Sequence, residues 1–348
     1  MPSARIKVRD ILLRVFIGLF AAAGFTIIYF FTRHGGIGVS PDSVVYSTTA
    51  DHLRQHGLLR DFTQRPMVNF PVFYPVFLSI VSIVTATGPV VIGPWINGLL
   101  FATLIGITGY MTNRFARRSP WYVVAVLACT VLSPALLEDY SMLWSETLFL
   151  VLELLFMLAL YRYVRVSAMP ALLLAASVAG LACVTRYAGV TLVLTGLIVI
   201  LLNSKLSVKT RLRHGFFFGM LSCTLLAANL LRNMIVSKTL TGSRERSLTS
   251  VTSNLTDIGK TFFSWINSQD ASARIAVGLS TAVLIALLIF FLVTTRQKGQ
   301  ADDLFTIPVL FALVYLVFIL AVATLSRFEE LNSRFLSPVY LPLLWAGS

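Results

Sequence analysis

Long apolar segments recur along the whole chain, separated by shorter polar stretches. A helix needs about 20 residues to cross the hydrocarbon layer of a membrane. We predict nine spans and the start of a tenth near Phe335. The nine cover residues 11–31, 90–112, 120–137, 145–162, 170–185, 187–203, 215–236, 274–294 and 305–326. The pattern therefore predicts an all-α polytopic membrane protein with about ten transmembrane helices.

The loop between the first two spans, 32–89, is long and patterned, and it predicts a surface-lying helix over residues 41–55. Ser40 is a typical N-cap, Pro41 suits the first helical position, and Gly57 is a typical residue just past a helix end.

A second apolar stretch of the same loop runs from Phe70 to about Thr85. Hydropathy alone permits a further span here, but that would reverse the orientation of every later loop. We therefore predict an interfacial or re-entrant helix.

Composition excludes a soluble domain. The chain is 57% hydrophobic and 12% charged, with a mean hydropathy of +0.82, whereas a soluble domain has roughly 25% charged residues. The net charge of +13 does not indicate nucleic acid, because the basic residues form short clusters between spans and not one soluble face.

These basic clusters predict the orientation, because Lys and Arg are enriched in cytoplasmic loops. They comprise Arg5, Lys7 and Arg9; Arg114, Arg117 and Arg118; Arg162 and Arg165; Lys205, Lys209, Arg211 and Arg213; Arg296 and Lys298. The segments 32–89, 138–144, 237–273 and 327–334 then face outward. Every acidic residue lies in or near these segments or in the span 145–162, apart from Asp10, Asp302 and Asp303.

We predict one transmembrane domain over residues 1–348. The polar segment 237–273 reads as a lid or a mobile loop. The last apolar run, 335–345, is too short to cross a bilayer, so we expect the C-terminus to be truncated or a last span to be missing.

Asp42 is the candidate catalytic residue. In the first turn of a helix, the helix dipole and the unbonded backbone N–H groups favour an ionised carboxylate. Such a group can act as a base or a metal ligand. The alternative is that Asp42 only helps to cap its helix.

Further carboxylates lie in the next outward loop and at the start of the following span. Glu138 and Asp139 are adjacent and are candidate ligands of a divalent cation such as Mg²⁺ or Mn²⁺; the alternative is a solvated loop. Glu146 and Glu153 share one helix face, and we expect both to point into the bundle, because a lipid-exposed charge is costly.

Basic residues at the outward helix ends are candidates for binding a phosphate, because the guanidinium fork matches phosphate oxygens. They are Arg186, Arg232, Arg244 and Arg334. The alternative for each is an arginine that reaches to lipid headgroups.

The order of several short motifs resembles the GT-C membrane glycosyltransferases, over nearly the whole chain. The group most like it comprises the dolichyl-phosphate-mannose protein mannosyltransferases and the bacterial lipid A aminoarabinose transferase. The motifs are Ser40-Pro41-Asp42 with Tyr46, Phe70-Pro71-Val72-Phe73-Tyr74-Pro75, Trp144-Ser145-Glu146-Thr147, Thr185-Arg186-Tyr187-Ala188-Gly189, Leu231-Arg232-Asn233, Leu240-Thr241-Gly242-Ser243-Arg244 and Arg334-Phe335-Leu336-Ser337-Pro338.

The resemblance implies an extracytoplasmic transferase that takes a sugar from a polyprenyl-phosphate carrier. An acidic residue of the first outward loop is essential in this family, and Asp42 occupies the matching place. A second acidic position falls on Glu138 or Asp139. Two departures leave the metal and the sugar open: Asp42 stands alone where the mannosyltransferases carry an acidic pair, and the two prolines of Phe70–Pro75 are not adjacent.

We therefore predict an inverting glycosyltransferase of a bacterial plasma membrane, with its active site on the extracytoplasmic face. Its partners are a polyprenyl-phosphate sugar donor and a lipid, glycan or protein acceptor. Asp42 is the catalytic base, and Glu138 and Asp139 hold a cation if one is used. Substrate binding is assigned to Tyr46, Glu146, Arg186, Arg232, Arg244 and Arg334.

The alternative is a transporter or flippase of lipid-linked sugars. Transporters place ionisable groups near the bilayer midplane, on broken helices related by internal repeats. This chain gathers them toward one surface and shows no such repeat.

Overall fold

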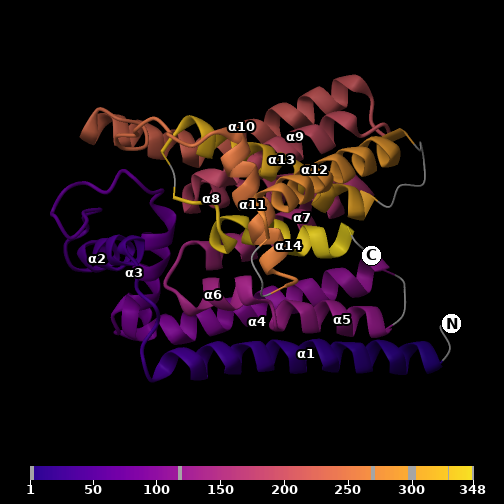
Figure 1. Cartoon of the computed structure of the whole chain (residues 1–348), viewed down its shortest axis with the longest axis horizontal. Coiled ribbons are helices and arrows are strands. Elements are labelled where there is room, and N and C mark those ends of the chain that lie inside the picture. Colours follow the sequence, from indigo (N-terminus) through magenta and orange to yellow (C-terminus); the bar gives the residue numbers. More distant parts are fainter. Residues whose placement is uncertain (1–3, 117–119, 268–270, 297–302, 328, 347–348) are drawn as a thin grey trace. The chain divides into compact units, whose positions relative to one another are not determined.

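The computed structural model describes residues 4–116, 120–267, 271–296, 303–327 and 329–346. These residues form fourteen α-helices, one short 3₁₀ helix and no β-strand (Figure 1). The predicted all-α class is therefore confirmed. Four residues used to predict orientation, Arg117, Arg118, Lys298 and Asp302, lie outside the described residues.

The chain divides into two compact units. Unit 1 comprises Met1–Gln64 and Pro75–Leu154, and unit 2 comprises Arg65–Tyr74 and Leu155–Ser348. The ten residues Arg65–Tyr74 thus belong to unit 2, although the chain before and after them belongs to unit 1.

Among the described residues, six helices are long and apolar enough to cross a membrane. They are Ile11–Arg33, Pro89–Arg114, Glu146–Val166, Val208–Ser237, Ala273–Thr294 and Thr306–Leu325. The predicted spans 170–185 and 187–203 are the shorter apolar helices α8 (Met169–Thr185) and α9 (Val190–Leu202). The chain is an integral membrane protein.

One predicted span, 120–137, is wrong as a continuous helix. It consists of α5 (Pro120–Val131) and α6 (Pro134–Ser141), which meet at an angle of 48°. Proline disfavours helical backbone in the preceding residue, and Ser133 is accordingly extended and caps α6 by accepting from the Leu136 N–H at 3.3 Å. The loop predicted around Glu138 and Asp139 is therefore largely helix.

In unit 1, α1 (Ala4–Arg33), α4 (Pro89–Ala116) and α5 lie side by side (Figure 1). The Trp95 ring of α4 contacts the rings of Phe25 and Tyr29 on α1, with centroid separations of 5.6 and 4.6 Å. Such packing contacts stabilise helix pairs in a membrane, where the hydrophobic effect between helices is absent.

The two helices predicted between the first two spans are both present. α2 (Pro41–His56) ends at Gly57, whose φ of 69° is the left-handed conformation that glycine adopts without strain. α3 (Phe73–Thr85) has 13 residues and reaches only about 20 Å at 1.5 Å per residue. It is too short to cross a bilayer upright, and its interfacial location stays a prediction.

In unit 2, α8 packs against α9 and α10 (Val208–Ser237), while α13 (Asp303–Leu325) packs against α9, α12 (Ala273–Arg296) and α14 (Ser333–Ala346). α7 (Glu146–Val166) begins in unit 1 and continues into unit 2.

The predicted polar loop 237–273 contains a helix that sequence analysis missed, α11 (Val251–Ser264). Its buried positions Asn254, Ile258 and Phe262 recur every four residues, as expected for a helix packed on one side. Asn254 donates to the Thr324 hydroxyl at 2.9 Å, and the Thr261 hydroxyl donates to the Leu331 carbonyl at 3.1 Å. This part of the segment therefore has fixed partners.

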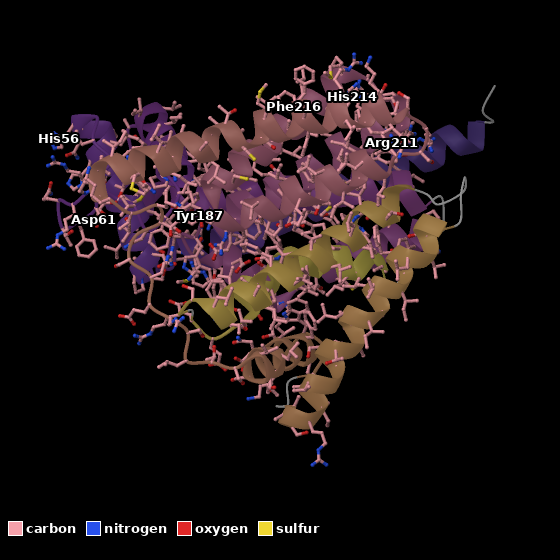
Figure 2. All side chains as sticks on the ribbon, turned by 90° about the horizontal axis from the view of Figure 1, so that it is seen from above. His56, Asp61, Tyr187, Arg211, His214 and Phe216 are labelled. Carbon is pink, nitrogen blue, oxygen red and sulfur yellow. The ribbon has the colours of Figure 1, made fainter. Side chains whose placement is uncertain are left out.

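Different residues lie at the two ends of the helices of unit 2. Figure 2 shows Arg211, His214 and Phe216 close together, with Tyr187 well away from them. At the Arg211 end, the Tyr163 hydroxyl and His214 Nδ1 are 2.8 Å apart. This end carries basic residues that were predicted to be cytoplasmic, and Tyr187 neighbours the candidate arginines. Which side of the membrane each end faces stays a prediction.

Candidate functional site

The start of α2 presents Asp42 as the sequence predicted. The Ser40 hydroxyl accepts from the Ser43 N–H at 3.4 Å, and the Ser43 hydroxyl accepts from the Ser40 N–H at 3.0 Å. This reciprocal capping satisfies two backbone donors. Pro41 holds the first helical position, and the half-buried Asp42 follows it in the first turn. The local field there favours a negative charge.

The N-cap is fixed in turn by a segment a hundred residues further along unit 1. The Gly38 N–H donates to the Ser141 carbonyl at 2.8 Å, and the Leu143 N–H donates to the Gly38 carbonyl at 2.9 Å. The Trp144 indole N–H donates to the Ser40 hydroxyl at 2.8 Å. The backbone around Asp42 is therefore held from two sides.

Asn97 of α4 holds the other side of this segment. Its buried side-chain amide donates to the carbonyls of Tyr140 and Met142 at 2.9 and 2.7 Å. A polar side chain inside an apolar span is the signal that could have identified Asn97 from sequence.

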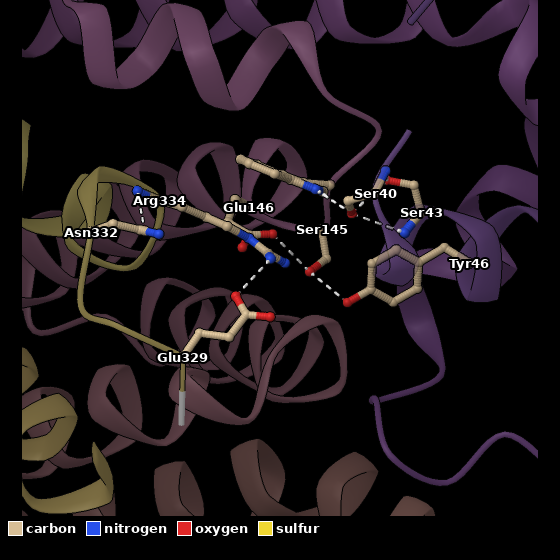
Figure 3. A network of polar contacts seen from close by, with 9 residues as sticks. Ser40, Ser43, Tyr46, Ser145, Glu146, Glu329, Asn332 and Arg334 are labelled. Carbon is tan, nitrogen blue, oxygen red and sulfur yellow. Dashed lines mark hydrogen bonds and ion pairs between the residues drawn. The ribbon is translucent and has the colours of Figure 1, made fainter. Parts of the chain in front are cut away.

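Tyr46 and Glu146 are joined through Ser145 in a chain of hydrogen bonds (Figure 3). The Ser145 hydroxyl donates to Glu146 Oε2 at 3.2 Å and lies 3.3 Å from the Tyr46 hydroxyl. Either hydroxyl can be the donor in the contact between Tyr46 and Ser145. Tyr46 and Glu146 are only 2% and 1% exposed, which confirms that Glu146 points inward. Glu153 is equally buried.

Glu138 and Asp139 differ in environment, although they are adjacent on α6. Glu138 is exposed, whereas Asp139 is completely buried. Two carboxylates that point into such different surroundings do not form a cation site by themselves. The residues that the structure describes contain no group of three His, Cys, Asp or Glu side chains able to hold a metal ion.

The arginine candidates all belong to unit 2. Arg186 is the half-buried residue at the end of α8, beside Tyr187. Arg232 and Arg244 both donate to backbone carbonyls of the segment 67–69, with distances of 2.5 Å from Arg232 Nη1 to Met67 O and 3.1 Å from Arg244 Nη2 to Asn69 O. These two candidates are therefore brought together.

Arg334 occupies a different setting, in the first turn of α14. Its guanidinium is 3.9 Å from the Glu329 carboxylate (Figure 3). It also lies 5.3 Å from the centre of the Phe335 ring. The Asn332 side chain accepts from the Arg334 N–H at 3.1 Å. The side chain of Arg334 is only 8% exposed, which is unusual for an arginine and argues against one that merely reaches to headgroups.

The predicted site residues are divided between the two compact units. Unit 1 contains Tyr46 and the carboxylates Asp42, Glu138, Asp139 and Glu146, and unit 2 contains the arginines Arg186, Arg232, Arg244 and Arg334. Sequence analysis assigned no role to Asn97, and it quoted Trp144, Ser145, Tyr187 and Asn233 only as motif letters.

A solved structure shares this architecture. ArnT from Cupriavidus metallidurans, in the apo state, matches with a TM-score of 0.60 and 15% sequence identity, over 98% of this chain and 59% of that chain. The chain has the fold of ArnT. The predicted resemblance to the GT-C membrane glycosyltransferases is therefore confirmed at the level of the fold.

The chain spans about three fifths of the length of that ArnT chain. No protein-family model matches the sequence, and no curated protein sequence matches it.

Proposed function

We propose that this protein is a membrane glycosyltransferase that moves a sugar from a polyprenyl-phosphate donor to an acceptor on the extracytoplasmic face, with inversion at the anomeric carbon. The observation that carries the proposal is the capped first turn of α2, which presents Asp42 on a fixed backbone within an ArnT-like fold. Site geometry adds to the fold here, because a fold alone does not determine a reaction.

In the proposed reaction, Asp42 takes the proton from an acceptor hydroxyl or amine. The acceptor atom then forms a bond to the anomeric carbon, and the bond from that carbon to the phosphate oxygen breaks on the opposite face. The electron pair leaves with polyprenyl phosphate. A single in-line displacement of this kind inverts the carbon, and general base catalysis contributes about 10²- to 10⁴-fold to such a step.

The leaving phosphate is assigned to Arg186, Arg244 and Arg334. Guanidinium groups stabilise developing charge on phosphate oxygens without reorganising at the moment of reaction. Arg244 is exposed, and a guanidinium carries five N–H donors, so its bond to the Asn69 carbonyl leaves further donor capacity.

Tyr46 and Glu146 are assigned to substrate binding. Both contact the Ser145 hydroxyl. Tyr46 lies one helical turn after Asp42 on α2. Its bond to Ser145 therefore holds the face of α2 on which Asp42 lies.

A divalent cation does not fit the residues predicted to hold it. Glu138 is exposed while Asp139 is buried, and oxygen-ligand cation sites use several converging ligands. We therefore route no step of the reaction through a metal.

The test is sugar transfer by the purified protein in lipid vesicles that contain a labelled polyprenyl-phosphate sugar. Asp42→Asn keeps the shape of the side chain and removes the base, so transfer should fall by about 10²- to 10⁴-fold. Asp61→Asn is the matched control. Asp61 accepts from Thr63 through Oδ1, which the asparagine amide oxygen can replace, and transfer should stay within about twofold.

Activity of Asp42→Asn within a few-fold of the unmodified protein would contradict the proposal. Movement of the lipid-linked sugar across the vesicle membrane without transfer would support the transporter alternative.

A further inference from the structure

Four side chains of unit 2 converge on three consecutive backbone carbonyls. The donors lie after α8, near the end of α10 and in the turn that follows it. Their acceptors are Met67 for Arg232, Val68 for both Tyr187 and Asn233, and Asn69 for Arg244. The corresponding distances are 2.5, 3.4, 3.4 and 3.1 Å. We call Tyr187, Arg232, Asn233 and Arg244 the carbonyl clamp.

Asn233 is the centre of the carbonyl clamp. Its side chain is completely buried. The amide nitrogen lies 2.8 Å from the Leu240 carbonyl and 3.3 Å from the Tyr187 hydroxyl, and the amide oxygen accepts from Arg232 Nη1 at 3.0 Å. A buried amide is costly to leave without partners. Loss of one clamp residue therefore weakens the bonds of the others.

Gly242 brings the turn after α10 against the clamped segment. Its φ is +76°, and a Cβ placed there would lie 1.8 Å from Asn69 Oδ1 and 3.5 Å from Asn69 Cα. Any other residue would be strained in this conformation and would push the Asn69 side chain away. The close approach at residue 242 is thus a second, separate feature that holds the same segment.

Arg232 already donates hydrogen bonds within the carbonyl clamp. Its Nη1 atom is shared between the Met67 carbonyl and the Asn233 amide oxygen, and its side chain is half-buried. A phosphate at Nη1 would have to compete with both acceptors.

We infer that the carbonyl clamp fixes the segment 67–69 and that Arg232 is a positioning residue for this segment and not a phosphate ligand. The segment connects α2, with Asp42 in its first turn, to α3, and it belongs to unit 2 while the chain on either side belongs to unit 1. Releasing it frees the chain that follows α2. The expected effect of releasing this segment on sugar transfer rests on the proposed function. The existence of the carbonyl clamp does not depend on that function.

Hydrogen–deuterium exchange of the peptide that covers residues 65–70 tests the clamp without any activity measurement. Arg232→Met removes the donors and keeps much of the side-chain length. Gly242→Ala perturbs the segment without touching an arginine. Arg232→Met should raise the exchange rate by about tenfold or more, since a hydrogen bond to a charged group contributes on the order of a tenfold change or more. Gly242→Ala should also raise the exchange rate, because the added Cβ displaces the Asn69 side chain.

Two variants serve as controls. Arg232→Lys retains a donor and should restore protection to within about threefold of the unmodified protein. Gly36→Ala imposes a similar left-handed strain at a φ of +84°, but no atom lies within 4 Å of the added Cβ, so exchange at 65–70 should not change.

Kinetics separates a positioning residue from a phosphate ligand. The inference requires that Arg232→Met and Gly242→Ala lower kcat together, with little change in KM for a polyprenyl-phosphate sugar. Unchanged exchange in both variants, or a raised KM in Arg232→Met alone, would overturn it. Because exchange needs no substrate, a failure of the proposed function would leave this part of the result intact.

Discussion

The candidate residues of unit 1 and unit 2 differ in how they relate to the backbone segments that polar side chains hold. In unit 1, the candidate Asp42 lies on a backbone that other side chains hold: the Ser40 hydroxyl accepts from the Trp144 indole N–H and from the Ser43 N–H, and the Ser145 hydroxyl lies 3.3 Å from the Tyr46 hydroxyl. In unit 2, the candidates Arg232 and Arg244 themselves donate hydrogen bonds to backbone carbonyls. The presence of an arginine at a helix end therefore does not by itself indicate a phosphate ligand. The groups that the arginine contacts must be known as well.

The largest expected effect on donor binding concerns two arginines of unit 2, each of which pairs with a glutamate. The side chain of Arg334 is 8% exposed beside Glu329, whereas that of Arg327 is 68% exposed beside Glu245. Arg334→Met should raise KM for the donor by about 10- to 100-fold, as expected for a lost charge-assisted bond to phosphate. Steady-state transfer assays measure this.

Arg327→Met is the matched control, because exposed ion pairs contribute only about 0–1 kcal/mol. Its donor KM should not move. Equal effects in the two variants would show that Arg334 acts on stability or orientation and not on the donor.

A smaller effect compares the helix caps of the two units. Ser40 caps α2, and Ser250 caps α11 by accepting from the Ser253 N–H at 3.1 Å. Replacing either by alanine should cost about 1 kcal/mol of stability. Thermal unfolding in detergent should show similar losses for both variants.

Only Ser40→Ala should also lower transfer, by several-fold, because it loosens the turn that carries Asp42. Ser40→Thr keeps the hydroxyl and should restore activity. If Ser250→Ala lowers transfer as much as Ser40→Ala does, the position of the cap next to Asp42 has no special importance.

The smallest effect comes from Asp257 on α11. Burial and the nearby charge of Glu330 raise the pKa of Asp257, while Lys260 opposes the shift. The folded state therefore binds this proton more tightly than the unfolded state does. The resulting stability is present at low pH and is lost as the pH rises through the raised pKa.

Asp257→Asn should therefore make the protein slightly more stable at neutral pH and flatten this part of the pH dependence. Thermal unfolding between acidic and neutral pH is the measurement. A loss of stability at neutral pH would show that the Asp257 carboxylate is stabilised by its surroundings when it is ionised.

Local signals allowed much of the fold to be predicted. Ser40, Pro41 and Gly57 mark the two ends of α2 within a few residues, and hydropathy identifies the long apolar helices. The break at Ser133-Pro134 was overlooked because a 20-residue hydropathy window averages across it. α11 was overlooked because its Ser- and Thr-rich sequence resembles a loop.

The candidate site was less predictable, because its contacts join distant parts of the chain. Ser40 and Trp144 are 104 residues apart, and Arg232 is 165 residues from Met67. Nothing next to Arg232 in sequence indicates that a carbonyl is its partner. Residue types and helix ends indicate which ionisable groups are candidates for the site, but they do not indicate which groups each arginine contacts.

A structure determined with bound polyprenyl phosphate tests the central claim most directly. The account predicts that the phosphate contacts at least one of Arg186, Arg244 and Arg334, that an acceptor site next to it lies about 3 Å from the Asp42 carboxylate, and that Arg232 remains on the Met67 carbonyl. A phosphate bound at the Arg211 end of α10, or one remote from Asp42, would contradict the account.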